Sequence, residues 1–299
     1  MATVVTHPSL AASESRLRTF LKAAREAPLS VVVILGGLLL VAIFADFLAP
    51  YDPTLPVKGA SVYDPPFWME GGNPATLLGT DFQGRDILSR LIHGARVSLI
   101  VGLMGTLVAG TIGTFMGILS GYVGGWVDQI IMRVTDAWLA LPAIVFAIFL
   151  AAMVGPSMWN IIVILGAVYW TRYARVIRGE VLTLRERDFV KLAEIAGASR
   201  LRVIKKHILP NVLNTATVLA SLTVGVVIIA EASLSFLGVG VPPPQPAWGL
   251  MLSEARPTLL AGQWWLTVFP GVCILLIVLA TQLFGDWLRV RLDPQTRNL

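Results

Sequence analysis

The chain has 299 residues, of which 56% are hydrophobic and only 14% charged, and its mean hydropathy is +0.75. Soluble domains carry about a quarter charged residues, so this composition indicates an integral membrane protein. The net charge of +5 does not indicate nucleic-acid binding, because membrane topology accounts for the basic residues and no aromatic-rich basic groove accompanies them. A single cysteine excludes an intrachain disulfide, and three widely separated histidines lack metal-ligand spacing, so we expect no metal site.

The N-terminal segment, 1–28, carries a short amphipathic pattern. Leu17, Phe20 and Leu21 share a helical face, and basic residues occupy the rest of the surface. This pattern predicts a helix that lies along the membrane surface and ends at Pro28.

Six apolar stretches are predicted to cross a hydrocarbon core of roughly 30 Å. Their approximate ranges are 29–50, 97–121, 130–154, 158–177, 212–239 and 265–288. An even number of spans places both termini on one side of the membrane. With the N-terminus inside and the cytoplasmic loop counted from 172 to 211, seventeen basic residues fall on the cytoplasmic side, five fall outside and Arg133 lies in the membrane. The positive-inside rule therefore predicts that both termini are cytoplasmic.

Two external segments follow from this topology. In the segment 51–96, an Asp N-cap signal before Ile87 predicts an interfacial helix that leads into the second span. After the fifth span, three consecutive prolines, 242–244, predict a stiff extended piece at the outer surface.

The second span contains a ridge of small residues at every fourth position, Ala109, Gly113, Gly117 and Gly121. In lipid, such ridges let helix backbones approach closely. The ridge therefore predicts a multi-helix bundle, with a dimer contact as the less specific alternative.

The largest cytoplasmic loop, 178–210, contains a second amphipathic pattern. Phe189, Leu192, Ala193 and Ala196 recur at helical spacing, so a short helix with one apolar face is predicted, and Gly197 is predicted to end it. Ser199 is a suitable N-cap for a further turn, and Pro210 is expected to mark where the next helix begins. Spacing alone is equally consistent with a passive connector and with a contact for an intracellular partner.

Charged residues inside the predicted spans need a partner or a wet cavity. Arg133 and Asp136 stand three residues apart and are expected to pair with each other. Glu231 precedes the bend at Ser235 and Phe236, where it is expected to support the bend or, alternatively, to contact a peptide amino group. The chain contains no P-loop, so it is not expected to bind ATP by such a loop.

The spacing of Ala193, Gly197 and Leu209–Pro210 resembles the EAA loop of permeases of ATP-binding-cassette (ABC) importers. Five blocks, in order along the chain, resemble the dipeptide/oligopeptide/nickel permease family and in particular its C-type subunit: GTDFQGRDILSRLIHGARVSLIVGL, GYVGGWVDQIIMRVTDAWLALP, RDFVKLAEIAGASRLRVIKKHILPN, EASLSFLGVGVPPPQPAWGLML and GDWLRVRLDP. FWMEGGNPATLLGTD further resembles the dipeptide branch. The sequence departs from the motif at Lys191–Leu192, which occupy its Glu-Ala positions, so a contact made by that glutamate does not carry over.

The resemblance implies an all-α membrane protein with the six-helix bundle of a type I ABC-importer permease, not itself an enzyme. It implies a bacterial inner-membrane location and import of dipeptides or short oligopeptides. The implied divisions are a cytoplasmic segment 1–28, a first span 29–50, a periplasmic or extracellular loop 51–96, a five-helix core 97–288 and a cytoplasmic tail 289–299.

The implied partners are a homologous second permease subunit forming a heterodimer, one or two ATPase subunits that hold ATP and Mg, and a periplasmic or lipid-anchored substrate-binding protein. A cytoplasmic coupling helix would dock on the ATPase through Asp188, Phe189, Ala193, Ala196, Gly197, Ala198, Ser199 and Pro210. Residues considered for the pathway or gate are Glu231, Ser235, Phe236, Arg133 and Asp136. Alternatives are the same machine carrying nickel chelates or another small solute, a secondary transporter, and a membrane scaffold.

Overall fold

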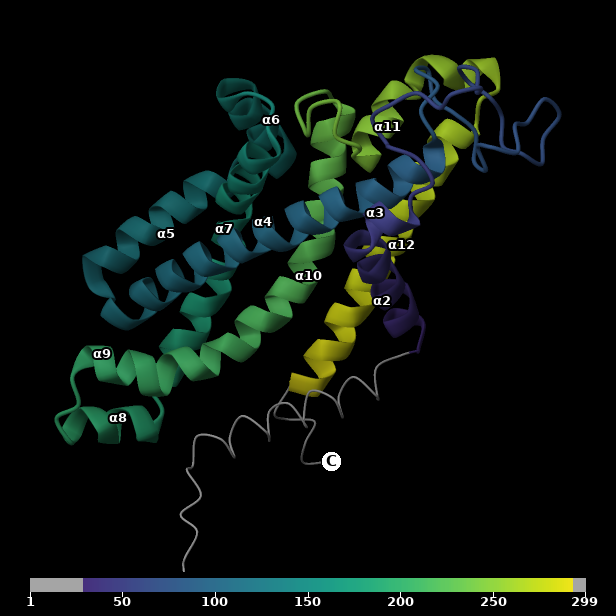
Figure 1. Ribbon diagram of the computed structural model, residues 1–299. Coiled ribbons are helices and arrows are strands. Elements are labelled where there is room, and N and C mark those ends of the chain that lie inside the picture. Colours follow the sequence, from purple (N-terminus) through teal and green to yellow (C-terminus); the bar gives the residue numbers. More distant parts are fainter. Residues whose placement is uncertain (1–28, 293–299) are drawn as a thin grey trace, which may run out of the picture.

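The computed structural model describes residues 29–292, and within this range every regular element is a helix, apart from isolated β-bridges that join Pro56 to Arg85 and Thr80 to Asp86 (Figure 1). The predicted all-α architecture is confirmed for these residues. The predicted surface helix before Pro28 lies outside the described residues.

The first predicted span, 29–50, is not one helix. It consists of α2 (Leu29–Ile43) and α3 (Ala45–Leu48), which are separated at Phe44, where φ is −94° and ψ is 21°. Arg96 donates from its side chain to the carbonyl oxygens of Ala42 and Ile43, at 2.9 and 3.3 Å, so this break is bonded to the next long helix.

The predicted interfacial helix and the second span form a single helix, α4 (Ile87–Val123). Asp86 caps its start, since its side chain accepts a hydrogen bond from the Ser89 backbone at 2.8 Å. No proline interrupts the following 37 residues, and the glycines within them are held by packing, so nothing ends the helix at the predicted boundary.

The third predicted span is broken. It comprises α5 (Gly125–Leu139) and α6 (Ala143–Val154), which are bent by 92° relative to each other. Pro142 stands at the break, where it lacks the backbone N–H that would continue the helix. The next helix, α7 (Met158–Arg185), extends beyond its predicted end at 177.

The predicted loop 178–210 contains the end of α7, α8 (Asp188–Ile195), α9 (Arg200–Val203) and a π-helical turn (Ile204–Ile208). The chain continues through α10 (Leu209–Phe236), α11 (Trp248–Glu254), a 3-10 helix (Arg256–Ala261) and α12 (Trp265–Leu292).

Three helical stretches of residues 29–292 are long and apolar enough to cross a membrane, namely Ile87–Val123, Arg200–Phe236 and Trp265–Arg291. The bent pair α5 and α6 would make a fourth if it counts as one span. α2 and α7 are not among these stretches, because α2 is shorter and the second half of α7 carries four arginines. An integral membrane bundle follows from these helices.

The ridge of small residues on α4 packs against α7 of the same chain. A Cβ atom added to Gly113 would lie 2.2 Å from the Trp170 carbonyl oxygen, and one added to Gly117 would lie 2.8 Å from that of Ala174. One added to Gly121 would meet the Val181 side chain at 2.8 Å. The ridge therefore packs within the chain, between α4 and α7. This close contact explains why small residues recur along it.

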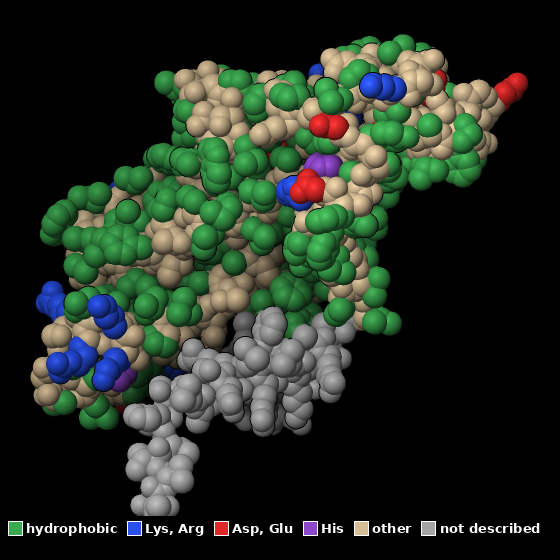
Figure 2. Space-filling view, viewed as in Figure 1, with side chains coloured by type: hydrophobic (Ala, Val, Ile, Leu, Met, Phe, Trp, Pro, Cys, Tyr) green, Lys and Arg blue, Asp and Glu red, His purple; other side chains and the backbone are tan. Residues whose placement is uncertain are grey.

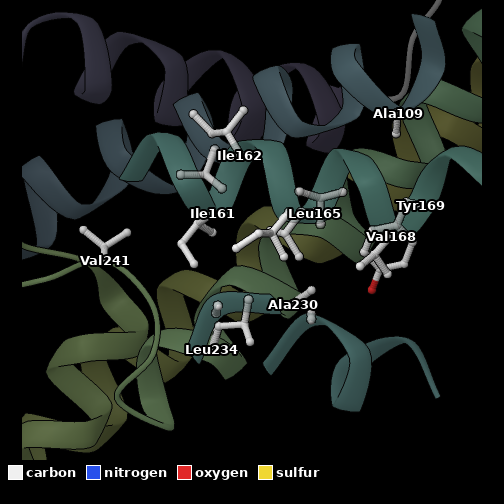
Figure 3. Close-up of a cluster of buried hydrophobic side chains, with 14 of the residues drawn as sticks. Ala109, Ile161, Ile162, Leu165, Val168, Tyr169, Ala230, Leu234 and Val241 are labelled. Atoms are coloured by element: carbon white, nitrogen blue, oxygen red, sulfur yellow. The ribbon is translucent and has the colours of Figure 1, made fainter. Parts of the chain in front are cut away.

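The apolar core lies where α4, α7 and α10 meet. Figure 3 shows Ala109 of α4, Ile161 and Leu165 of α7, and Leu234 of α10 directed into one cluster. Because lipid tails are as apolar as these side chains, close packing contributes most of what this cluster adds to stability.

The two ends of the bundle differ (Figure 1). α8 and α9 project at one end, and α11 gathers with the loop before α4 at the opposite end. α4 and α10 run between these ends, so they connect the two regions described next.

Candidate functional site

The helix α8 ends in a Schellman motif. The backbone N–H of Gly197 donates to the Glu194 carbonyl at 2.9 Å, and that of Ala198 donates to the Ala193 carbonyl at 3.0 Å. Gly197 has φ +81°, in the left-handed region, and an added Cβ would meet nothing within 4 Å. Backbone conformation, and not space, is therefore the reason for glycine at this position, and the helix end predicted there is confirmed.

Buried side chains hold α8 and α9 against the bundle. Val190 of α8, Val203 of α9 and Ile208 of the π-helical turn are each 0% exposed and pack in one cluster with Ile177 and Val181 of α7. This cluster fixes the loop to the end of the bundle.

Two further contacts join α8 to neighbouring elements. The Tyr122 hydroxyl at the end of α4 donates to Glu194 at 2.9 Å, and the Phe189 ring lies 6.0 Å from the His207 ring. α8 is thereby connected both to α4 and to the π-helical turn that precedes α10.

The outer surface of α8 exposes large apolar side chains among charged ones. Leu192 is 63% exposed, Ile195 is 83% exposed and Phe189 is partly exposed. Of the predicted apolar face, Phe189, Leu192 and Ala196 are exposed, whereas Ala193 packs partly against the buried cluster. Ile195, which the predicted face did not include, is the most exposed large apolar side chain of α8. The buried Val190 was missed, since a helix covered on one side and apolar on the other has no single apolar face.

Pro210 stands in the first turn of α10, as predicted. This helix is nevertheless continuous with the helical turns before it. Arg200–Phe236 is one helical run, and the π-helical turn Ile204–Ile208 lies directly before the proline. Proline lacks an N–H and its ring crowds the carbonyl four residues earlier, and a π-helical turn accommodates both effects without ending the helix. Ser199 stands at the N-cap position of α9, but its side chain makes no capping hydrogen bond.

Charged groups surround the exposed side of α8. Lys191 lies 2.9 Å from Glu186 and forms a solvent-exposed ion pair. This hydrogen bond lowers the pKa of Glu186 and raises the pKa of Lys191. Lys and Arg side chains gather over α8 and α9 (Figure 2). Asp188 in the first turn of α8 lies at the positive end of the helix dipole.

Glu231 supports the bend that ends α10. It is fully buried and accepts hydrogen bonds from Ser235 at 2.7 Å and from Ser98 of α4 at 3.4 Å. The Ser235 oxygen in turn accepts from the Val241 backbone at 3.1 Å, across the bend. Beyond it, the Arg256 guanidinium lies 3.7 Å from the centre of the Phe236 ring. Glu231 thus reaches the bend through Ser235.

The expected pair of Arg133 and Asp136 is wrong. Asp136 accepts a hydrogen bond from Arg175 of α7 at 2.7 Å, and Asp128 of α5 pairs with Arg178 of α7 at 2.6 Å. Residues three apart on one helix were expected to pair, but α7 presents arginines to α5 and these bridge the two helices instead. Arg133 is exposed.

A buried ion network that the sequence did not indicate lies at the end of the bundle opposite α8. Arg85 lies 2.6 Å from Asp81 and 3.2 Å from Glu254 of α11, and Arg90 of α4 lies 2.8 Å from Glu254 and also pairs with Asp81. Both arginines are at most 2% exposed. Glu254 is separated from the others by more than 160 residues of sequence, so local patterns carry no signal for it.

These features define the class of the molecule: an integral membrane helix bundle, with a capped helix held on one end and a buried ion network on the other. The chain matches the family of binding-protein-dependent transport system inner membrane components over residues 113–298. It belongs to this family.

Several relatives are similar over most of the chain. The di/tripeptide transport system permease protein DppC of Pseudomonas aeruginosa is 42% identical over 270 residues, which cover 88% of each chain. The dipeptide transport system permease protein DppC of Escherichia coli K12 is 45% identical over 87% of this chain and 86% of its own length. The glutathione transport system permease protein GsiD of Pectobacterium atrosepticum is 40% identical over 87% of this chain and 84% of its own length.

Proposed function

We propose that this chain is a permease subunit of an ABC importer that carries dipeptides or short oligopeptides across the bacterial inner membrane. The similarity to permeases of dipeptide and di/tripeptide transport systems over almost nine-tenths of the chain supports this substrate class. The family description places such chains among inner membrane components that depend on a binding protein.

The proposed topology has six spans with both termini in the cytoplasm, and the divisions expected from the sequence, 1–28, 29–50, 51–96, 97–288 and 289–299, are retained. In this topology α7 is the fourth span. Pairing of Arg175 and Arg178 with carboxylates of α5 supports it, because paired charges are less costly within a membrane than isolated ones.

The proposed partners are a homologous second permease subunit, ATPase subunits that hold ATP and Mg, and a periplasmic or lipid-anchored binding protein. The chain itself would carry out no chemistry. Energy would reach it as motion, when closure of the ATPase dimer displaces the loop 178–210 and the attached helices.

The observation that carries this proposal is the exposed apolar side of a firmly held helix. α8 is bonded to α4 through Glu194 and packed on α7 through Val190, yet it presents Leu192 and Ile195 to solvent. A rigid helix with unpartnered apolar residues is suited to seat in a groove of another protein and to transmit its displacement. The residues proposed for coupling are Asp188, Phe189, Ala193, Ala196, Gly197, Ala198, Ser199 and Pro210, together with Leu192 and Ile195.

A second part of the proposal concerns the pathway. Glu231, Ser235 and Phe236 are proposed to hold an outer gate, because the Glu231–Ser235–Val241 chain of hydrogen bonds sets the bend after α10. Arg133 and Asp136 on α5 are proposed to lie near the inner part of the pathway.

The test is purification of the complete complex and its reconstitution in vesicles with the binding protein outside. We expect ATP-dependent uptake of dipeptides, and no uptake without ATP. Uptake independent of ATP would favour a secondary transporter, and uptake of nickel chelates or glutathione without dipeptides would reassign the substrate.

The coupling role is tested separately with Gly197→Asp, which places a charge and a restricted backbone in the turn after α8. We expect insertion and assembly to persist and ATP-coupled uptake to be lost. Normal substrate-stimulated ATP hydrolysis and uptake by this variant complex would contradict the coupling role.

A further inference from the structure

An open cavity of about 250 Å³ lies at the break between α5 and α6. Its walls come from Trp138 before the break, Phe146 after it, and Tyr169, Thr171 and Arg172 of α7. This volume is just below the range of small-molecule sites, roughly 300–1,000 Å³, so it suits one end of a small ligand.

The aromatic wall of this cavity is held in place from several directions. The Trp138 indole donates to the Ala167 carbonyl at 2.8 Å, and its ring contacts Phe146 edge-on at 4.9 Å between centroids. The Trp170 ring also contacts the Trp138 ring edge-on, at 6.2 Å between centroids. The break between α5 and α6 is therefore organised around an apolar surface suited to a side chain.

Arg172 supplies a positive charge at this cavity and has no ion pair with any residue in the range 29–292. Its guanidinium lies 5.6 Å from the centre of the Tyr169 ring. The next two arginines along α7 are both neutralised, Arg175 by Asp136 and Arg178 by Asp128. Arg172 is exposed, and it is the one of these three arginines that lines the cavity, so its guanidinium is available to a ligand there.

Thr171 provides a second unmatched group. It is 0% exposed and lines the cavity, and its hydroxyl has no hydrogen-bond partner among the described residues. Hydroxyls in membrane helices ordinarily bond to a carbonyl of the preceding turn, as those of Thr135 and Thr223 do here. The cavity thus combines an apolar wall and a cation, and the unpartnered Thr171 hydroxyl is buried behind that wall.

We propose that this cavity is a transient site for the C-terminal end of the transported peptide, with the carboxylate on Arg172 and the last side chain against Trp138 and Phe146. This inference rests on the proposed function. A guanidinium recognises a carboxylate through two parallel hydrogen bonds, and one such contact gives an affinity from which the substrate can still leave.

The experiment replaces Phe146 with the photoreactive p-benzoylphenylalanine in the complete complex and supplies tritium-labelled alanyl-leucine through the binding protein. Illumination during ATP turnover should attach label to this chain. In the Arg172→Gln background we expect about tenfold less label, since a charged hydrogen bond is lost. Arg172→Lys, which keeps the charge but not the planar fork, should give an intermediate yield.

Arg175→Gln is the matched control, because it removes an arginine one turn further along α7 whose charge is already paired with Asp136. Its label yield should stay within about twofold of the parent. Co-purification of all subunits establishes that each variant assembles, and the parent with Arg172 intact tests the site even where Arg172→Gln does not assemble.

Three results would overturn the inference while leaving the proposed function standing: equal labelling with and without Arg172, dipeptide uptake without any label at position 146, or capture of the second permease subunit in place of the peptide. If the unmodified complex takes up no dipeptide at all, the proposed function fails first.

Discussion

At the end of the bundle near α11, Asp81, Arg85, Arg90 and Glu254 are joined in a buried ion network, whereas at the opposite end Lys191 and Glu186 pair in contact with solvent. The first region ties the loop before α4 to α11 through groups that have left water. The second keeps its charges hydrated and exposes apolar side chains of α8.

This difference indicates different tasks. Removing one member of a buried network leaves an uncompensated charge, so the first end should hold one arrangement firmly. An exposed ion pair contributes little, so the second end depends on Val190 and the Tyr122–Glu194 hydrogen bond for its position. We expect the first end to act as a fixed anchor and the second to be free for a partner.

The largest effect is expected at the buried network. Arg90→Leu removes a guanidinium that pairs with Asp81 and Glu254, and should lower the free energy of unfolding by about 3–5 kcal/mol. Unfolding of the detergent-solubilised protein by sodium dodecyl sulfate measures it. Arg175→Leu, which removes a solvent-exposed pair with Asp136, should cost less than about 1 kcal/mol, and equal losses would contradict the contrast.

The helix that connects the two ends should be sensitive at its ridge. In Gly113→Ala the new Cβ would lie 2.2 Å from a backbone oxygen of α7, so the helices must separate, at a cost of about 1–3 kcal/mol. Gly179→Ala is the control, because a Cβ there meets nothing within 4 Å. A ridge that served only an intermolecular contact would leave the monomer's unfolding unchanged in both variants.

Substitutions of Gly197, in the turn after α8, should lower stability because of the backbone conformation and not because of a clash with neighbouring atoms. Gly197→Val forces a branched residue into the left-handed region, at a cost of about 1–2 kcal/mol. Gly197→Asn should cost clearly less, since asparagine tolerates this conformation. The two variants are compared by thermal unfolding, and equal behaviour would show that φ at this position is not limiting.

A substitution on the exposed side of α8 should impair transport without changing the stability of the protein. Ile195→Asp replaces a side chain that is 83% exposed, so the free energy of unfolding should change by no more than about 0.5 kcal/mol, while ATP-coupled uptake should fall at least about tenfold. Leu260→Asp, at the opposite end and fully exposed, should leave uptake unchanged. Loss of uptake in both variants would remove the special role of α8.

The smallest effect is expected at the solvent-exposed pair. The pKa of Glu186 is lowered by Lys191, so any contribution of the pair is present above the ordinary pKa of glutamate and is lost as the pH falls through the lowered value. Because both groups are fully exposed, Lys191→Met should leave the thermal midpoint unchanged at neutral pH and in acid. A clear shift at neutral pH alone would mean that this end is also held by charge.

Much of the molecule could be predicted from local patterns. The Asp86 cap, the end of α8 at Gly197 and the tight packing of the Gly113 ridge follow from short-range rules of backbone geometry. Element boundaries were less reliable, because no residue between Ile87 and Val123 marks the predicted division between an interfacial helix and the second span. Pro210 does mark the start of α10, but the π-helical turn that joins α10 to α9 was not predicted.

Charge pairing was the part that local patterns misjudged. The partner of Asp136 was sought on its own helix, but it is Arg175 of α7, and Glu254 joins Arg90 only when α11 folds back onto α4. Both pairings depend on which helices become neighbours, and spacing along the chain does not contain that information.

The sequence by itself determined that this is a helical membrane protein with a short capped helix in a basic loop, because hydropathy and glycine placement act locally. Tertiary structure alone decided which apolar residues of that helix remain exposed and which charges are buried together. It also decided that Arg172 lines a cavity at the α5–α6 break without an ion pair to any residue of the described range 29–292. The physical reason is that burial and ion pairing are properties of neighbours in space, and only the packing of α4, α7 and α10 brings those neighbours together.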